Sequence, residues 1–278
     1  MLPPLPTVTA SRYVQPLREG GSLPAVVDTG SGLFVVKFRG AGQGAKALVA
    51  ELLVGSLAAA LSLPVPDMAI VDLPEPFGRS EPDPEIQDIL RRSHGLNVGL
   101  RYLDGAFNFA VAAAGDLVEP GLASRIVWFD ALVTNPDRTH RNPNILVWER
   151  RPWLIDHGAA LYAHHDWARV DAARTRSPFQ LIEHHVLLGA ASELERADTE
   201  LAPLLTDALI EGALARVPDD LLLDPAGGRE FATAGEARAR YLSYLRERLG
   251  EPRAFVDEAV AVRTRLLAGE PTRLLSRR

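Results

Sequence analysis

The chain has 278 residues, 47% hydrophobic and 24% charged, a length and balance that suit one large domain or two packed lobes. Its formal net charge of −6 argues against binding nucleic acid by bulk attraction, and the absence of cysteine excludes disulfides and thiolate metal sites. The longest apolar run contains Glu51 and ends at proline, so we expect no membrane span and a cytoplasmic location. The sequence does not indicate an oligomeric state.

The N-terminal third has the pattern of short strands followed by one helix. β-Branched runs at residues 24–30 and 32–38 flank a glycine-containing turn, which indicates a hairpin. A dense apolar run without proline predicts a helix over residues 45–62 that is packed on most sides and stopped by Pro64. Residues 67–74 then have the composition of another strand.

The middle of the chain mixes loops, a helix and a second hairpin. Proline and acidic residues dominate residues 74–94, which predicts a surface insertion or flexible connector, and a strand is expected over 95–103. A helix is expected from Asp116, as its cap, to Val133. After a polar loop, the segment "ILVWERRPWLID" predicts a hairpin that turns at residues 150–152, with Trp148 and Trp153 as packing partners.

From about Pro178 onward the periodicity is helical, and four helical segments are predicted at residues 179–197, 200–217, 234–250 and 252–269. The order of elements indicates an α+β protein with two unequal lobes. The first, residues 1–100, is a small β-rich lobe with one main helix, and the second, residues 101–278, is larger and mostly helical. A cleft between the lobes is the expected ligand site.

The loop and hairpin after Val133 bring polar groups together. Asp137 precedes Asn142 by five residues, and the second strand of the hairpin ends at Asp156. Because a hairpin returns its second strand beside the start of its first, we expect Asp156 close to Asn142 and to Asp137. Carboxylate and carboxamide oxygens suit Mg²⁺, which binds few protein ligands together with phosphate oxygens. The spacing therefore indicates phosphoryl transfer.

The first half of the chain offers a cation for phosphates. Lys37 lies at the end of an apolar strand, where a lysine is costly unless it is paired or reaches solvent. Glu51, an isolated acid in the apolar helix, is its expected partner. Upstream, Gly20, Gly21 and Ser22 form a turn whose backbone N–H groups are candidates to cover phosphates.

These residues, in this order, resemble the HipA-like kinases, relatives of protein kinases and phosphatidylinositol kinases. The similarity rests on the glycine turn, "VVKF", the helix with Glu51, "NPDRTHRNPNILVW" and "LIDHG". It covers roughly residues 10–190 and is strongest over 128–165. Two departures stand out: Thr139 replaces the histidine of the phosphatidylinositol-kinase motif, and His157 replaces the phenylalanine of the protein-kinase DFG motif.

The resemblance implies a two-lobed protein-kinase-like fold that binds ATP and Mg²⁺ and phosphorylates a serine or threonine of a protein substrate. Asp137 would act as catalytic base, and Asn142 and Asp156 would hold the metal. Lys37 would contact the α- and β-phosphates, with Glu51 positioning it. His140 or Arg138 would touch the γ-phosphate, and adenine would lie near residues 95–105.

Each residue also has a plainer interpretation. Asp137 is a turn former in Asn-Pro-Asp, Asn144 is an alternative to Asn142 as ligand, and Lys37 is an edge-strand charge if it is unpaired. The histidine pairs lack zinc spacing and are expected to be structural. At the level of function, the alternatives are a small-molecule kinase of the aminoglycoside type and an inactive nucleotide-binding regulatory module.

Overall fold

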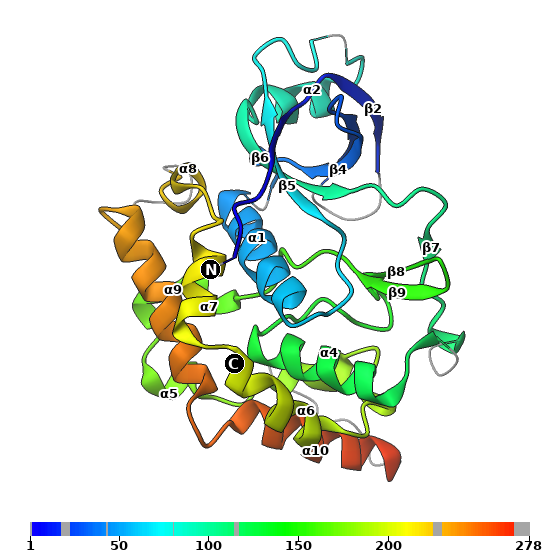
Figure 1. The fold of residues 1–278 in the computed structure, drawn as a ribbon, viewed down its shortest axis with the longest axis vertical. Helices are drawn as coiled ribbons and strands as arrows, with labels where there is room; N and C mark the ends of the chain where they lie inside the picture. Colours follow the sequence, from blue (N-terminus) through cyan, green and yellow to red (C-terminus); the bar gives the residue numbers. More distant parts are fainter. Residues whose placement is uncertain are drawn as a thin grey trace.

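The N-terminal part of the chain forms a curled sheet, at the top of Figure 1. The computed structural model describes residues 2–17, 23–42, 44–79, 81–113, 117–224 and 230–269. Within these residues six strands pair in the order β1-β5-β6-β4-β3-β2, with β1 parallel to β5 and the other neighbours antiparallel. The strands are β1 (Thr7–Thr9), β2 (Arg12–Pro16), β3 (Ala25–Asp28), β4 (Leu33–Lys37), β5 (Met68–Leu73) and β6 (Gly95–Arg101).

Most of the elements predicted for this half are present. Strands β3 and β4 form the expected hairpin, and helix α1 (Gly44–Ala60) follows it. Pairing between β4 and β6 sets Lys37 opposite Val98 at the end of the ladder. The glycine turn at Gly20, Gly21 and Ser22 lies outside the described residues.

The prediction of a connector over residues 74–94 is wrong in part. The structure has a helix there, α2 (Pro84–Arg91), with Asp83 accepting hydrogen bonds from the first-turn N–H groups. Its apolar side chains, among them Ile86 and Leu90, pack into the core of the curled sheet. Proline is common at the first helical position, and aspartate is a good N-cap. Asp83 and Pro84 therefore favour the start of a helix, although the surrounding residues are rich in proline.

A second, three-stranded sheet has the order β7-β8-β9, made of β7 (Phe107–Asn108), β8 (Ile145–Trp148) and β9 (Arg151–Leu154). The predicted β8–β9 hairpin is confirmed, but it turns one residue earlier than expected. Glu149 and Arg150 both have positive φ, and Arg151 already pairs with Trp148. Two consecutive positive φ values suit the right-handed twist of a hairpin.

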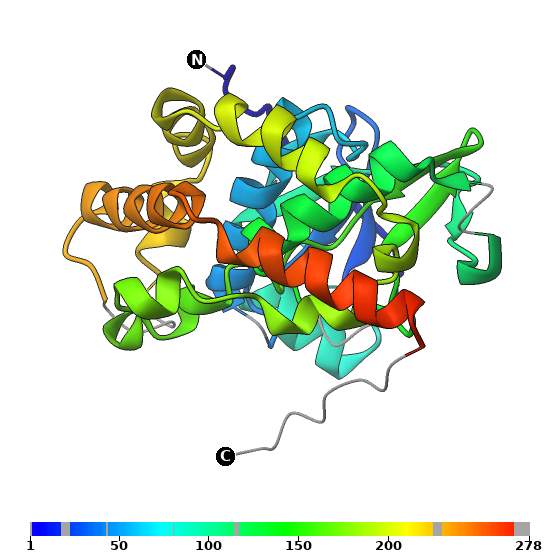
Figure 2. The same cartoon turned by 90° about the horizontal axis from the view of Figure 1, so that it is seen from below.

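The remaining chain is mostly helical. Its helices are α4 (Pro120–Leu132), α5 (Ala172–Thr175), α6 (Leu194–Leu201), α7 (Asp207–Leu214), α8 (Asp219–Leu222), α9 (Ala234–Leu249) and α10 (Ala254–Leu267). Figure 2 shows α10, in red, along the underside of this lobe. The last two predicted helices are confirmed as α9 and α10.

Three helix predictions need correction. Of the helix expected over residues 200–217, Ala202–Leu204 form a 3₁₀ turn and α7 begins only at Asp207. α4 starts at Pro120, after the expected beginning, and its expected cap Asp116 lies outside the described residues. Much of residues 179–197 forms short 3₁₀ turns, at Gln180–His184 and Leu188–Ala190, before α6 begins. The apolar residues at helical spacing in this segment still pack into the core of the helical lobe, and Ile182 and Leu188 are fully buried. Their spacing alone therefore does not distinguish an α-helix from a series of 3₁₀ turns.

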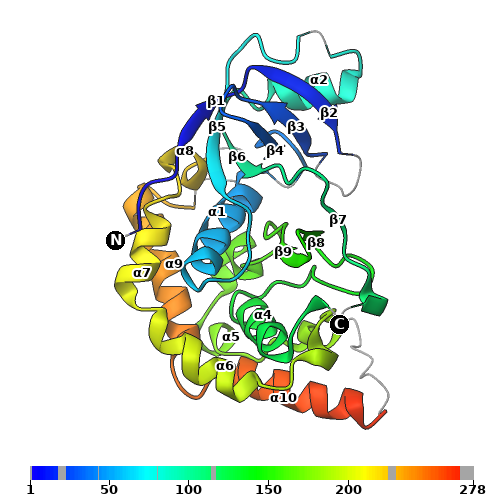
Figure 3. The same ribbon diagram turned by 45° about the vertical axis from the view of Figure 1, so that its right-hand side comes forward.

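Helix α1 follows β4 in the chain and packs between the two lobes. It lies between the six-stranded sheet and the lower helices (Figure 3). Its apolar residues, such as Leu52 and Leu57, belong to the same core cluster as α4 and the β8–β9 hairpin. The predicted burial on most sides is therefore confirmed, and α1 packs against both the helical lobe and the sheet.

The architecture confirms the predicted α+β class, with a β-rich first lobe and a larger helical lobe. The boundary at residue 100 stays a prediction. Among the described residues, no helix is both long and apolar enough to cross a membrane.

Candidate active site

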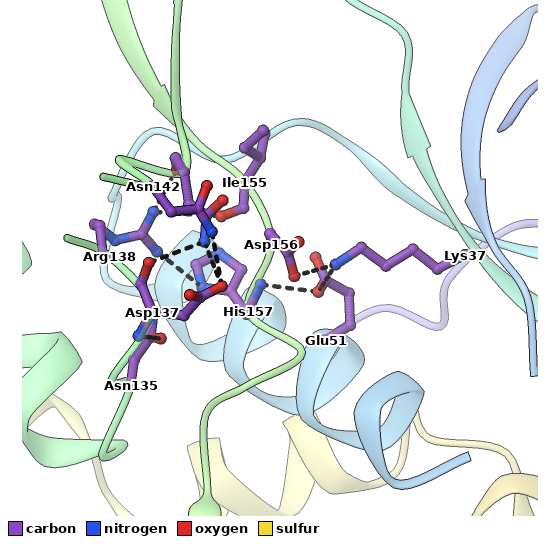
Figure 4. A network of polar contacts seen from close by, with 10 residues as sticks. Lys37, Glu51, Asn135, Asp137, Arg138, Asn142, Ile155, Asp156 and His157 are labelled. Atoms are coloured by element: carbon purple, nitrogen blue, oxygen red, sulfur yellow. Dashed lines mark hydrogen bonds and ion pairs between the residues drawn. The ribbon is translucent and has the colours of Figure 1, made fainter. Parts of the chain in front are cut away.

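Lys37 reaches from the right of Figure 4 toward the other labelled residues, and its ammonium contacts two carboxylates, those of Glu51 and Asp156. Its Nζ is 2.7 Å from Glu51 Oε2 on α1 and 2.5 Å from Asp156 Oδ1, just beyond β9. The predicted Lys37–Glu51 pair is confirmed. A lysine, a helix glutamate and the aspartate of the hairpin, far apart in sequence, therefore meet where the lobes face each other.

The burial of these three groups differs. The side chains of Lys37 and Glu51 are 10% and 0% exposed, whereas that of Asp156 is 36% exposed. Burial alone lowers the pKa of Lys37, but attraction from Glu51 and Asp156 outweighs it and raises the pKa above its ordinary value. Burial raises the pKa of Asp156, but the Lys37 ammonium reverses this and holds it below its ordinary value. The cluster therefore presents a permanent cation beside a partly open carboxylate.

Glu51 also holds the segment that carries Asp156. The backbone N–H of His157 donates to Glu51 Oε2 at 2.8 Å, so one carboxylate oxygen accepts from both Lys37 and His157. Asp156 itself has a left-handed backbone, with φ +56°. Such a conformation is uncommon for a residue other than glycine and persists where its surroundings hold it.

Asp137 lies in the loop between α4 and β8. Its Oδ2 accepts from the Nδ2 groups of Asn142 at 2.9 Å and Asn144 at 3.0 Å, and its backbone N–H donates to Asn135 Oδ1 at 3.1 Å. Asp137 and Asn142 were expected near the same end of the hairpin, and their side chains are in direct contact. The second amide, from Asn144, was not expected beyond its place as an alternative to Asn142.

Arg138 turns away from the site into the core. Its side chain is fully buried, and its Nε donates to Asp130 Oδ2 at 2.6 Å. Its other nitrogens contact the carbonyls of Asn144 and Ile155 and the ring Nδ1 of His157. The expectation that Arg138 touches the γ-phosphate is wrong, because a guanidinium enclosed in this way cannot reach a ligand. His140 is exposed, and its contact with phosphate stays a prediction.

The groups that sequence reasoning missed are those that hold Arg138. Asp130 on α4 accepts from Arg138 and, at 3.0 Å, contacts His185 Nε2. An aspartate inside the apolar run "RIVWFDALV" was a signal of a buried, paired charge. Burial and the neighbouring Arg138 lower the pKa of His157 to about 3, so its ring is neutral at physiological pH.

The remaining expected contacts are structural. The rings of Trp148 and Trp153 meet edge to face at 5.5 Å, as predicted for hairpin packing partners. His164 is buried against the hydroxyl of Tyr241.

Residues 102–106 carry the chain from β6 to β7, and Trp148 Nε1 donates to the carbonyl of Asp104 there. Adenine binding near residues 95–105 stays a prediction.

The oxygen donors of the site fit a hard divalent cation. Asp156 has a carboxylate that is partly open to solvent, and Asn142 is exposed with its Nδ2 engaged by Asp137. Among the described residues, no group of three or more histidine, cysteine, aspartate or glutamate side chains is placed so that it could hold a metal ion. Two or three oxygens completed by phosphate are the pattern that Mg²⁺ favours.

A β-rich lobe, a connecting helix that pairs with a strand lysine, and a loop–hairpin with two carboxylates define a kinase-type fold and site. Comparison with known sequences identifies the family: the profile of the HipA-like kinases matches residues 17–173, and the chain belongs to that family. No curated protein matches the sequence significantly. Among solved structures, the Helicobacter pylori proinflammatory kinase CtkA is similar, with a TM-score of 0.55 and 13% identity over 95% of this chain and 99% of that one. At this identity the likeness concerns the fold.

Proposed function

We propose that this kinase transfers the γ-phosphoryl group of ATP, bound with Mg²⁺, to a serine or threonine hydroxyl of a protein in the cytoplasm. The observation that carries the proposal is the double contact of Lys37 with Glu51 and Asp156. A cation fixed by a helix glutamate, beside a carboxylate that is partly open, is the arrangement that places phosphates and their metal together in kinases.

Lys37 is the residue that binds the α- and β-phosphates. Glu51 keeps its ammonium in place, since Glu51 is itself fixed by the N–H of His157. Asp156 and Asn142 are the residues that would hold Mg²⁺, which when bound neutralises charge on the phosphate oxygens. Gly20, Gly21 and Ser22 would cover the phosphates with backbone N–H groups.

Asp137 accepts the proton of the acceptor hydroxyl. Among the described residues, amide donors occupy its Oδ2, whereas no donor contacts its Oδ1. That oxygen is the one available to orient a hydroxyl for attack on the γ-phosphorus. His140, exposed three residues further on, would stabilise charge on the γ-phosphate. A protein acceptor is proposed because of the family to which the chain belongs.

The proposal is tested with Asp137→Asn. We expect transfer of radiolabelled γ-phosphate to acceptors in a lysate to fall by about 10²–10⁴-fold, the usual contribution of a general base. Binding should survive, because the carboxamide has the same size as the carboxylate it replaces and Lys37 is untouched. Millimolar MgATP should therefore raise the melting temperature of both proteins.

Two results would contradict the proposal. Equal transfer by Asp137→Asn and the wild type would remove Asp137 from catalysis. A wild-type melting temperature that does not respond to MgATP would remove nucleotide binding. Asp171→Asn is the matched control, because Asp171 is an exposed aspartate at the start of α5 and should leave transfer unchanged.

A further inference from the structure

Asn144 differs from Asn142 in burial and in backbone conformation. It is 9% exposed, whereas Asn142 is exposed, and it precedes β8 with a left-handed backbone of φ +48°. Its Nδ2 lies 3.0 Å from Asp137 Oδ2 and 3.3 Å from the carbonyl oxygen of Asp137. One amide group therefore contacts both the side chain and the main chain of the proposed base.

The main chain of Asn144 is fixed from the opposite side. Its carbonyl accepts from the N–H of Ile155 at 3.0 Å and from the buried Arg138 guanidinium. Ile155 is the residue immediately before Asp156, and Arg138 the one immediately after Asp137. Asn144 is thus tied to both carboxylate-bearing segments, and it is held more rigidly than the exposed Asn142.

We propose that Asn144 is a positioning residue for the transfer reaction: it holds Asp137 Oδ2 so that Oδ1 faces the acceptor hydroxyl. With two amides on one oxygen, rotation of the carboxylate costs two hydrogen bonds instead of one. A base within hydrogen-bond reach of its proton works only while that geometry is kept, and small displacements reduce rates strongly. The inference rests on the proposed function.

A plainer reason for an asparagine at this position is its tolerance of the left-handed conformation. Glycine adopts that conformation more easily still. The variant Asn144→Gly therefore separates the two explanations: it keeps the backbone and deletes the amide. If asparagine is needed only for the backbone, Asn144→Gly is silent.

The experiment measures kcat, KM for MgATP and melting temperature. For Asn144→Gly we expect kcat to fall by about 10- to 100-fold, with KM for MgATP within about twofold of the wild type, because the amide acts through Asp137. Asn144→Asp, which also tolerates the left-handed backbone, should lose more, because it sets a carboxylate oxygen against Asp137. The matched control is Arg150→Gly, an exposed residue with φ +61° at the other end of the hairpin, which should retain wild-type kinetics.

Wild-type kcat in Asn144→Gly would overturn the inference while leaving the proposed function intact. A lowered affinity for MgATP, or a higher Mg²⁺ requirement at unchanged maximal rate, would also overturn it, because Asn144 would then act on the metal and not on Asp137. If Asn144→Gly fails to fold, unchanged kcat in Asn144→Asp is the overturning result. A wild type that neither binds MgATP nor transfers phosphate would defeat the proposed function first, and the inference with it.

Discussion

Two buried charge networks lie next to each other in this kinase, and they differ in access to solvent. The closed network consists of Asp130, Arg138 and His185, whose side chains are 0–2% exposed. The open network consists of Lys37, Glu51 and Asp156, and Asp156 is 36% exposed. His157 joins them, because its backbone N–H donates to Glu51 and its ring contacts Arg138.

The difference shows what each network is able to do. The side chains of the closed network are almost completely buried, and Arg138 contacts the carbonyls of Asn144 and Ile155. Its contribution is therefore to hold the loop of Asp137, the start of β8 and the end of β9 in one arrangement. In the open network Lys37 contacts the Asp156 carboxylate, which solvent reaches. Under the proposed function, a phosphate would take the place of Asp156 next to Lys37, or a metal ion would take the place of Lys37 next to Asp156. The closed network should therefore dominate stability, and the open network should dominate ligand binding.

The largest expected effect on stability comes from Asp130→Ala. It leaves the Arg138 guanidinium buried without its counter-charge, and breaking one partner of a buried pair costs about 3–5 kcal/mol. Urea unfolding followed by circular dichroism measures the loss in free energy of unfolding.

The control is Asp171→Ala, which removes an exposed helix-capping aspartate and should cost about 1 kcal/mol. If Asp130→Ala loses no more than Asp171→Ala, the closed network does not carry the stability assigned to it.

The next effect is a dependence on pH through His157. Its pKa is about 3 in the folded chain, against an ordinary value of 6.5, because it is buried next to Arg138. Between these values the unfolded state binds more protons, so the free energy of unfolding falls as the pH falls. The free energy of unfolding changes by about 1.4 kcal/mol per pH unit below the ordinary pKa. His157 should therefore lower the free energy of unfolding by about 2 kcal/mol between about pH 7.5 and about pH 5.

His157→Phe removes that share. Urea unfolding at the two pH values should give a smaller difference in the variant than in the wild type, whatever the absolute stability of the variant. The other buried histidines, His164 and His185, whose pKa values burial also lowers, contribute to the difference that remains. Equal pH dependence in both proteins would mean that His157 accepts a proton while folded.

Of the contacts in the open network, the pair between Lys37 and Glu51 was predictable from sequence, whereas the contact of Lys37 with Asp156 was not predicted. A lysine in an apolar strand and a glutamate in an apolar helix each needed a partner, and the pair between Lys37 and Glu51 is present. The meeting of Asp137 with Asn142 followed from a loop before a hairpin. The roles of these residues remain proposals.

The closed network does not follow from the motif. Arg138 comes directly after the expected catalytic aspartate, which suggests a phosphate contact, but its partner is Asp130, an acid isolated in an apolar helix. The second bond to Asp137 depends on the left-handed turn at Asn144, which composition does not reveal. Helix α2 is hard to predict because proline usually ends a helix, whereas Pro84 stands at the start of this one.

The smallest effect on stability and a large effect on binding are expected together in Lys37→Met. Burial already raises the pKa of Glu51, and Lys37 is the main group that opposes this rise. Without Lys37 the Glu51 carboxyl therefore takes up a proton more readily and does not remain as a buried charge. The free energy of unfolding should then fall by only about 1–2 kcal/mol, the cost of imperfectly satisfied polar groups. The rise in melting temperature with MgATP should disappear, since the proposed phosphate contact is gone. Lys46→Met is the matched control: Lys46 lies on α1 and pairs with Glu230 at 2.8 Å, so its loss should leave the MgATP response in place. A Lys37→Met protein that still responds to MgATP as the wild type does would mean that the open network, like the closed one, serves the fold alone.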